Sequence, residues 1–233
     1  DVITINGINE TYVTDENTAS EKRKVAREKI TEILNILSGT KASDDAFYIL
    51  NSGRYEFKNK GIDLFINALG KLNKSAELNK EIVAVIAVPA NISGIYKELE
   101  YRREGKKPIE GHTDLPCTHH IFGYEYDAVL NSLRENGLNN NSEDKVKVMF
   151  VPSYLNGNDG VFNLKYNDFL YAFDLTVFPS YYEPWGYTPM ESIAHGIPTV
   201  TTDLAGFGRY IQDEKFENES VAIVHREEGN GII

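Results

Sequence analysis

Residues 46–88 decide the fold, and they read AFYILNSGRYEFKNKGIDLFINALGKLNKSAELNKEIVAVIAV. Two apolar runs in this stretch, Ala46–Asn51 and Ile82–Val88, are the length of a strand. Between them, Gly61–Leu72 carries apolar residues at helical spacing. Strands that are apolar on both faces and separated by a helix are typical of a parallel sheet covered on both sides. The stretch therefore predicts a βαβ unit with a right-handed crossover.

The same alternation continues toward the C-terminus. Further strands are predicted at Val146–Val151, Leu175–Pro179, Pro198–Thr201 and Val221–Val224, and further helices at Tyr126–Leu133, Asn167–Ala172 and Pro189–His195. The predicted fold is α/β, a doubly wound parallel sheet of the Rossmann-like kind. Ligands of such sheets bind at the carboxyl ends of the strands, so we expect the functional residues in the loops that follow the strands.

Two segments do not follow this alternation. Residues 1–43 contain a long amphipathic helix at Ser20–Leu37, which we interpret as a lead-in from a preceding domain, docked on the sheet of residues 44–233. Residues 91–144 are polar and resemble an insertion, with a charged amphipathic stretch at Ser93–Arg103. The chain opens on Asp1 without a Met, and we expect it to be a piece of a larger protein.

Charge and cysteine usage exclude several classes of protein. The chain has 24 Lys and Arg against 35 Asp and Glu, a net charge of −11, whereas nucleic acids and anionic membranes need an electropositive partner. We therefore expect no nucleic-acid and no membrane partner. No apolar run approaches the roughly 20 residues that span a bilayer. The single cysteine, Cys117, excludes an intrachain disulfide and suits a reducing cytosol, which predicts a cytoplasmic protein.

The loop after the first predicted strand, Ser52–Gly61, carries the cations Arg54 and Lys60 ahead of a helix. Arg54 can bind two phosphate oxygens at once, and Lys60 supplies a point charge. The free N–H groups of the following helix start add a partial positive charge. This pattern predicts a diphosphate site, with a solvated loop as the alternative.

The loop Phe178–Glu191 follows another buried strand and opens another helix. Thr188 is the predicted N-cap and Pro189 the predicted first helical residue. The backbone N–H groups of Trp185, Gly186 and Tyr187 could hold an anion at this helix start. Two carboxylates, Glu183 and Glu191, flank the loop. The alternative is an aromatic turn in which Glu191 only complements the helix dipole.

Two other motifs are weaker. Ala205-Gly206-Phe207-Gly208 has Ile211 where a dinucleotide fingerprint has its third glycine, so we expect a tight turn there. His112, Cys117, His119 and His120 lie close together, but their spacing matches no familiar zinc pattern. Polar surface or interface residues are the favoured interpretation of that group.

Several segments together resemble one family. SGRYEFKNKG (52–61) and FPSYYEPWGYTPME (178–191) are similar to the two signature segments of the UDP-glucose-using glycogen synthases of the animal and fungal type. KVKVMFVPSYL (145–155) and TTDLAGFGRY (201–210) resemble the same family. The resemblance implies the C-terminal, nucleotide-sugar-binding half of a two-domain GT-B glycosyltransferase, whose partner is the N-terminal GT-B domain.

The resemblance also implies roles for individual residues. The implied catalytic residues are Glu183 beside the donor glucose, and Arg54 and Lys60 on the diphosphate. The implied donor-binding residues are Glu191 on the ribose, Tyr166 stacked on uracil, and the loop of Trp185, Gly186, Tyr187 and Thr188. A stacked aromatic is a reasonable base platform, since every base has a π-face.

The implied reaction transfers glucose from UDP-glucose to the non-reducing end of an α-1,4-glucan with retention of configuration. The leaving diphosphate would then be stabilised by Arg54, Lys60 and a helix N-terminus, and we expect no metal and no other cofactor. Glu183 either stabilises the positive charge on the sugar or acts as a double-displacement nucleophile. The resemblance leaves a homo-oligomer open.

Some features depart from the family. Asp174 stands where we expect a His, which puts contacts to the base or ribose in doubt. The glycine-rich donor loop of the N-terminal domain is missing from this sequence, so we expect the fragment alone to be inactive. Two alternatives remain: another retaining GT-B glycosyltransferase, and a non-catalytic module that binds nucleotide sugars.

Overall fold

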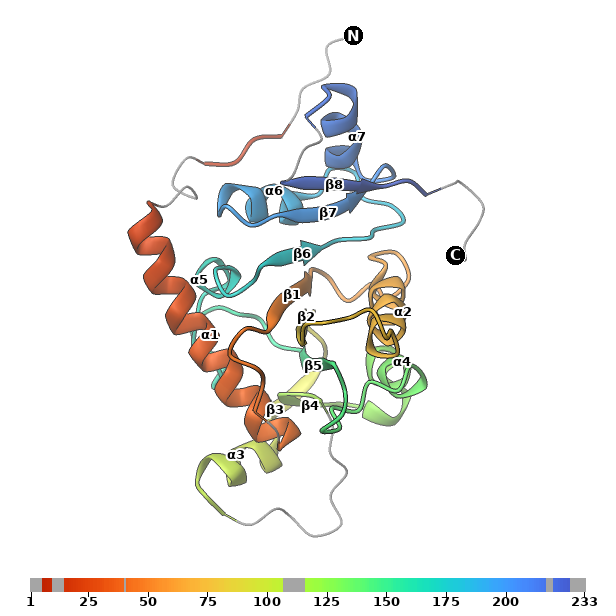
Figure 1. Cartoon of the computed structure of the whole chain (residues 1–233). Helices are drawn as coiled ribbons and strands as arrows, with labels where there is room; N and C mark the ends of the chain where they lie inside the picture. Colours follow the sequence, from red (N-terminus) through yellow and green to blue (C-terminus); the bar gives the residue numbers. More distant parts are fainter. Residues whose placement is uncertain (1–5, 10–14, 40, 107–115, 217–219, 227–233) are drawn as a thin grey trace.

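The computed structural model describes residues 6–9, 15–39, 41–106, 116–216 and 220–226. Within this part of the chain, six parallel strands form one sheet in the order β5-β2-β1-β6-β7-β8 (Figure 1). Their bounds are β1 Phe47–Ser52, β2 Ile82–Ala87, β5 Val146–Val151, β6 Leu175–Val177, β7 Thr199–Thr202 and β8 Val221–Val224. Each predicted strand is present to within two residues at either end.

The strand order reverses beside β1. From β1 the chain moves outward through β2 to β5, and then returns to β6 on the other side of β1 and moves outward again through β7 to β8. This arrangement confirms the predicted doubly wound sheet. It also defines a topological switch point between β1 and β6, where the loops at the carboxyl ends of the two strands diverge and leave a crevice for a ligand.

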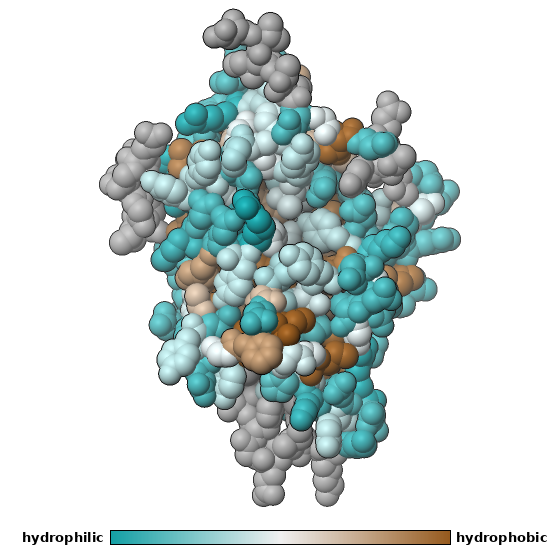
Figure 2. Space-filling model, turned by 180° about the vertical axis from the view of Figure 1, so that it is seen from behind, coloured by the Kyte–Doolittle hydropathy of each residue, from teal (hydrophilic) through white to brown (hydrophobic). Residues whose placement is uncertain are grey.

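Helices cover both faces of the sheet (Figure 1). On one face, α1 (Glu16–Ser38) and α5 (Tyr166–Leu170) bury apolar residues against β1, β2 and β5. On the other face, α2 (Ile62–Asn73) and α4 (Ala128–Glu135) pack on the same three strands. A smaller apolar cluster joins α6 (Tyr187–Ala194) and α7 (Gly206–Asp213) to β8. Because most apolar side chains are buried in these layers, the rear surface is mostly hydrophilic, with a few small hydrophobic areas (Figure 2).

The long helix α1 is fixed at both ends by capping groups. The Asp15 carboxylate accepts a hydrogen bond from the Thr18 N–H at 3.1 Å, and Gly39 ends the helix in the left-handed conformation. Ala26, Ile30 and Leu34 bury the apolar face of α1 in the core shared with the sheet. The helix is therefore docked on the sheet as predicted, and it begins four residues before the predicted start.

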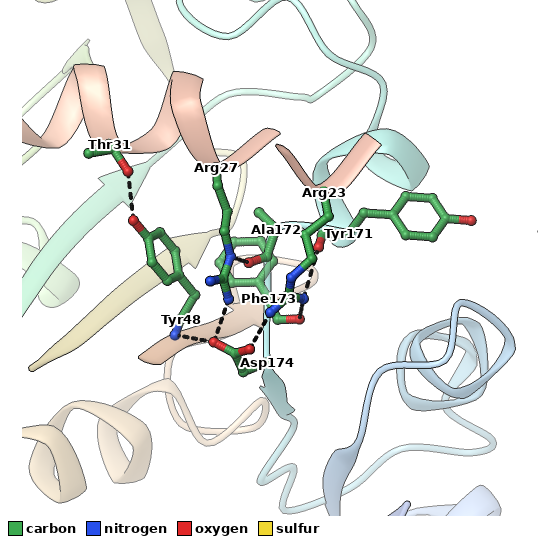
Figure 3. Close-up of polar contacts among 8 residues, drawn as sticks. All are labelled: Arg23, Arg27, Thr31, Tyr48, Tyr171, Ala172, Phe173 and Asp174. Carbon is green, nitrogen blue, oxygen red and sulfur yellow. Dashed lines mark hydrogen bonds and ion pairs between the residues drawn. The ribbon is translucent and has the colours of Figure 1, made fainter. Parts of the chain in front are cut away.

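Asp174 joins α1 to the sheet (Figure 3). Its carboxylate pairs with the guanidinium groups of Arg23 and Arg27, at 2.5 Å for Arg27, and accepts the Tyr48 N–H at 2.9 Å. The two arginines also donate to the carbonyl oxygens of Tyr171, Ala172 and Phe173. Asp174 directly precedes β6 and therefore lies at the amino edge of the sheet. The expectation that this residue affects contacts to a base or ribose is wrong, because ligands bind at the opposite edge.

Replacing Asp174 with Asn is expected to lower the free energy of unfolding by about 2–3 kcal/mol, because two half-buried guanidinium groups lose their counter-charge. Burial raises the pKa of Asp174, but the Tyr48 N–H and the two arginines together lower it by more, so the pKa lies below the ordinary 3.8. The stabilisation is therefore present above that pH and is lost as the pH falls through the lowered pKa. Urea unfolding of both proteins between neutral and acid pH would test this. A difference that does not shrink in acid would contradict it.

Two regions differ from the sequence-based prediction. Residues 91–144 contain a small antiparallel pair of strands, β3 (Ile92–Ile95) with β4 (His119–Ile121), followed by the 3₁₀ helix η2 (Tyr124–Tyr126). Of the amphipathic stretch at 93–103, only α3 (Lys97–Arg103) is helical.

Gly206 and Gly208 lie in the first turn of α7, so the predicted tight turn is wrong. Glycine is needed there for close packing, since a Cβ would lie 2.2 Å from the Pro184 oxygen or 2.0 Å from the Thr202 oxygen.

Candidate functional site

The loops after β1 and β6 meet at the switch point of the sheet. The Tyr181 N–H donates to the Asn59 carbonyl oxygen at 2.7 Å. Gly61 lies so close to Pro179 that an added Cβ would be 2.0 Å from the Pro179 oxygen. The two segments singled out from the sequence are therefore one surface, although more than a hundred residues separate them in the chain.

Lys60 and Glu183 form an ion pair across this junction. Both side chains are largely buried, with 15% and 18% of their surface exposed. Burial and the nearby charge of Arg54 lower the pKa of Lys60, and the charge of Glu56 opposes them. The structure thus brings two of the predicted catalytic residues into direct contact. In this structure the ammonium group of Lys60 is paired with the Glu183 carboxylate.

The Glu183 loop is also held from its other side by the start of α7. The Gly206 N–H donates to the Glu183 carbonyl oxygen at 3.0 Å, and the Phe207 N–H donates to the Trp185 carbonyl oxygen at 2.7 Å. These bonds continue a short parallel bridge between Glu183 and Ala205. A carboxylate on a backbone held from both sides has a defined position, as an electrostatic role requires.

A pocket of about 270 Å³ opens beside this junction, at the carboxyl ends of β1, β2 and β5. Its lining residues are Ser52, Gly53, Ala87, Pro89, Ser153, Tyr154, Leu155, Asn156, Tyr166 and Thr188. This volume is near the lower end of the range for small-molecule sites and suits a planar base with its ribose. The pocket therefore joins the loop of the cations to the predicted base platform and to α6.

Tyr166 and Glu191 lie near each other beside the pocket. The Tyr166 hydroxyl shares a hydrogen bond of 2.7 Å with Ser52 Oγ, and the pKa of Tyr166 is raised by burial and by the charge of Glu191. Burial also raises the pKa of Glu191 above its usual range. No hydrogen bond to the Glu191 carboxylate is found within the described residues, so its oxygens are available to a ligand's hydroxyl groups.

The start of α6 differs by two residues from the predicted one. Gly186 is the N-cap, in the left-handed region with φ of 105°, and the helix begins at Tyr187. The expectation that Thr188 is the N-cap and Pro189 the first helical residue is therefore wrong. The backbone N–H groups of Gly186, Tyr187 and Thr188 have no acceptor in the described part of the chain. Such free N–H groups are typical of an anion-binding helix start.

The start of α2 is less available than expected. The Ile62 N–H donates to the Phe57 carbonyl oxygen at 3.0 Å, and the Asp63 N–H points to the same oxygen. This helix start is thus capped by its own loop. Of the two helix starts that the sequence predicted to offer free N–H groups, only the start of α6 does so in the described residues.

The remaining predicted donor-binding residues have different surroundings. The Trp185 ring packs against Phe207 and Tyr210 of α7, with ring centroids 6.0 Å and 5.8 Å apart. These contacts attach the Glu183 loop to α7. Tyr187 is half exposed beside the free N–H groups. Arg54 is much more exposed than Lys60 and pairs through Nε with Glu56 at 3.1 Å.

Sequence reasoning missed two groups of the site. Tyr154 lines the pocket and is 74% exposed, so it offers a second aromatic face, and its place after β5 was the available signal. Tyr55, next to Arg54, donates to the Asp127 carboxylate at 2.6 Å, which itself caps the start of α4. The polar segment 91–144 therefore supports the loop that carries the cations, a long-range contact that leaves no local pattern.

The described members of the histidine and cysteine group have structural contacts. His112 lies outside the described residues. Cys117 is buried, which raises the pKa of its thiol to about 12. His119 donates from Nε2 to the Asp159 carbonyl oxygen, and its Nδ1 shares a hydrogen bond with Thr118 Oγ1. In the described segments, no group of three or more His, Cys, Asp or Glu is arranged to hold a metal ion.

A larger cavity of about 760 Å³ lies at the amino edge of the sheet, between α1 and α6. Two of its charged residues, Arg23 and Asp174, already pair with each other. The smaller pocket at the carboxyl edge is the better candidate, because unpaired polar groups converge there and because ligands of doubly wound sheets bind at that edge.

A doubly wound sheet whose switch point holds two cations, a free helix start and an aromatic pocket is typical of Rossmann-like domains, and its candidate site suits a nucleotide. The family model for glycogen synthase matches residues 1–99 and 110–228. The chain belongs to the glycogen synthase family.

Individual relatives agree with this assignment. The chain is 34% identical to glycogen [starch] synthase isoform 2 of Saccharomyces cerevisiae, over 73% of this chain and 33% of that protein. It is 33% identical to glycogen [starch] synthase of Caenorhabditis elegans, over 78% of this chain and 35% of that protein. The chain thus spans about a third of the length of these relatives.

A solved structure supports the fold. The C-terminal domain of a glycosyl transferase group 1 family protein from Francisella tularensis matches with a TM-score of 0.51 and 14% identity, over 95% of this chain and 81% of that chain. At this identity the likeness concerns the fold alone. None of the described helices is both long and apolar enough to cross a membrane.

Proposed function

We propose that this chain is the donor-binding domain of a glycogen synthase. The activity is transfer of glucose from UDP-glucose to the non-reducing end of an α-1,4-glucan, with retention of configuration. The observation that carries the proposal is the convergence of Arg54, Lys60 and Glu183 with the Tyr166 pocket at the switch point. Family membership supports the reaction, and the geometry supports the roles of the residues.

We propose one orientation for the donor. Uracil lies in the pocket against Tyr166, and the ribose hydroxyls are held by Glu191. The diphosphate then lies over the N–H groups at the start of α6, within reach of Arg54 and Lys60. The glucose follows on the side of Glu183. This order places each chemical group of the donor next to a side chain or backbone group of matching charge.

The transition state separates a positively charged sugar from a diphosphate leaving group. Arg54, Lys60 and the start of α6 stabilise the developing negative charge, and we propose that they do so without a metal ion or another cofactor. The partly buried Glu183 carboxylate stabilises the positive charge on the sugar. Binding of the diphosphate draws Lys60 away from Glu183, so the donor itself frees this carboxylate for the sugar.

The partners follow from this site. The donor pocket of this domain is open, and we propose that the N-terminal GT-B domain of the full-length protein closes it and binds the α-glucan acceptor. This chain alone then binds a uridine nucleotide weakly and does not elongate glucan. We further propose a cytoplasmic location, since UDP-glucose and reduced Cys117 suit that compartment.

Turnover of UDP-glucose and ADP-glucose by the full-length protein on a glycogen primer tests the proposal. Elongation with UDP-glucose is expected. Elongation of a non-glucan acceptor alone would instead favour another retaining glycosyltransferase. Binding of UDP without any transfer would favour the non-catalytic module.

Replacing Glu191 with Gln is expected to weaken UDP binding by about 1.5–3 kcal/mol, because hydrogen bonds from the ribose hydroxyls to a charged carboxylate are lost. Uracil binding should not change, since the base lies against Tyr166. Calorimetry with UDP and uracil on both proteins measures this difference. UDP affinity equal to that of the unmodified chain would remove Glu191 from the donor site.

A further inference from the structure

Glu56 lies in the centre of the loop that carries both cations, and the proposed function gives it no role. Its two carboxylate oxygens have separate partners. Oε1 accepts a hydrogen bond from Arg54 Nε at 3.1 Å, and Oε2 accepts one from Asn59 Nδ2 at 2.7 Å. Its backbone N–H donates to the Arg54 carbonyl oxygen, and its own carbonyl oxygen accepts the Lys60 N–H, each at 2.8 Å.

The way in which Glu56 holds Arg54 matters for anion binding. A guanidinium group held through Nε keeps both terminal nitrogens free, and these form the end-on fork that binds two oxygens of a phosphate. No hydrogen bond or ion pair to Arg54 Nη1 or Nη2 is found in the described part of the chain. Arg54 is 72% exposed and Glu56 34%, so without this contact the arginine would have little to fix its orientation.

Glu56 also links this loop to the Glu183 loop. Its partner Asn59 accepts the Tyr181 N–H through its carbonyl oxygen, and Tyr181 lies two residues before Glu183. The charge of Glu56 raises the pKa of Lys60 against the lowering effect of burial. One carboxylate therefore orients Arg54, helps keep Lys60 charged, and joins both cations to the second loop of the site.

We propose that Glu56 is a positioning residue that orients the Arg54 guanidinium for two-point binding of the donor diphosphate. This inference rests on the proposed function. A carboxylate this close to a bound diphosphate also repels it, so the two effects of Glu56 on UDP have opposite signs. If charge alone mattered, removing Glu56 would tighten UDP binding. If Glu56 orients Arg54, its removal should instead weaken UDP binding, because the freed arginine side chain must be immobilised when the donor binds.

Calorimetry with UDP and with uridine separates these cases. Glu56→Ala is expected to weaken UDP binding about three- to tenfold, the cost of immobilising one long side chain, and to leave uridine binding unchanged. Glu56→Gln retains an oxygen that can accept from Arg54 Nε, and it should recover most of the affinity. In an Arg54→Ala background, Glu56→Ala should produce no further loss, because its target is absent.

Controls keep the test specific. Glu104→Ala removes an exposed carboxylate that pairs with Lys106 at the end of α3, and it should leave UDP binding unchanged. Unchanged thermal unfolding midpoints show that the variants are folded. Equal or tighter UDP binding by Glu56→Ala, or the same loss with and without Arg54, would overturn the proposal for Glu56 alone. An Arg54→Ala variant that binds UDP normally would instead overturn the proposed donor site.

Discussion

Glu183→Gln in the full-length protein is expected to lower turnover about 100–1000-fold, the usual effect of removing one fixed group that stabilises transition-state charge. The change keeps the size of the side chain and most of its hydrogen bonds but removes its charge. UDP should bind at least as tightly as before, because the Lys60 ammonium loses its ion-pair partner and is free for the diphosphate. Turnover numbers paired with UDP calorimetry measure both effects.

The separation of rate from binding is what makes this variant informative. Glu214→Gln, at the exposed end of α7, removes the same charge far from the junction and should change neither quantity. Loss of UDP binding by Glu183→Gln, combined with normal binding by Glu191→Gln, would mean that the roles of the two glutamates are reversed. A normal rate together with normal binding would make the loop structural only.

Gly61→Ala is expected to lower the free energy of unfolding by about 3–4 kcal/mol and to abolish UDP binding. Gly61 has φ of 64°, which costs an L-residue about 1–2 kcal/mol. In addition, the new methyl group would lie 2.0 Å from the Pro179 carbonyl oxygen, a backbone atom that also accepts a hydrogen bond from Arg226. The clash can be relieved only by separating the loops that carry Lys60 and Glu183.

Gly39→Ala is the matched control for that prediction. Gly39 has nearly the same φ, 68°, but an added Cβ would meet no atom within 4 Å. It should therefore cost only the conformational term of about 1–2 kcal/mol and leave UDP binding intact. Urea unfolding and UDP calorimetry on both variants compare strain alone with strain plus clash. Equal losses of stability would show that the two loops are not in tight contact at Gly61.

Much of the fold followed from local patterns in the sequence. Strands buried on both faces, such as Val146–Val151, are nearly continuous apolar runs, and a helix such as α2 has a regular apolar face. Both can therefore be predicted without tertiary information. The predicted site loops were found for a related reason, because in a doubly wound sheet a loop that follows a strand lies at the ligand edge. Glycines and cations in such loops then indicated which of them bind an anion.

What the sequence could not determine depends on contacts between distant residues. The glycines of α7 were interpreted as a turn, because glycine disfavours helices, and only the approach of Pro184 and Thr202 explains them. Asp174 was expected to affect contacts to the base or ribose, because the family resemblance implies a His at this position. In the structure it instead pairs with two arginines about 150 residues earlier in the chain. The free N–H groups at α6 were predicted, but those at α2 are capped by the Phe57 carbonyl oxygen of the preceding loop, and no spacing in the sequence encodes that contact.

The sequence by itself determined the class of fold, the edge of the sheet where the candidate site lies, and the charged residues that mark this site. These follow from hydrophobic periodicity and from charge, which are local properties of the chain. The tertiary structure decided that Lys60 pairs with Glu183, that Glu56 holds Arg54, and that Tyr154 shares the pocket of Tyr166. These pairings arise where β5, β2, β1 and β6 end at one edge of the sheet, and only the folded chain brings those ends together.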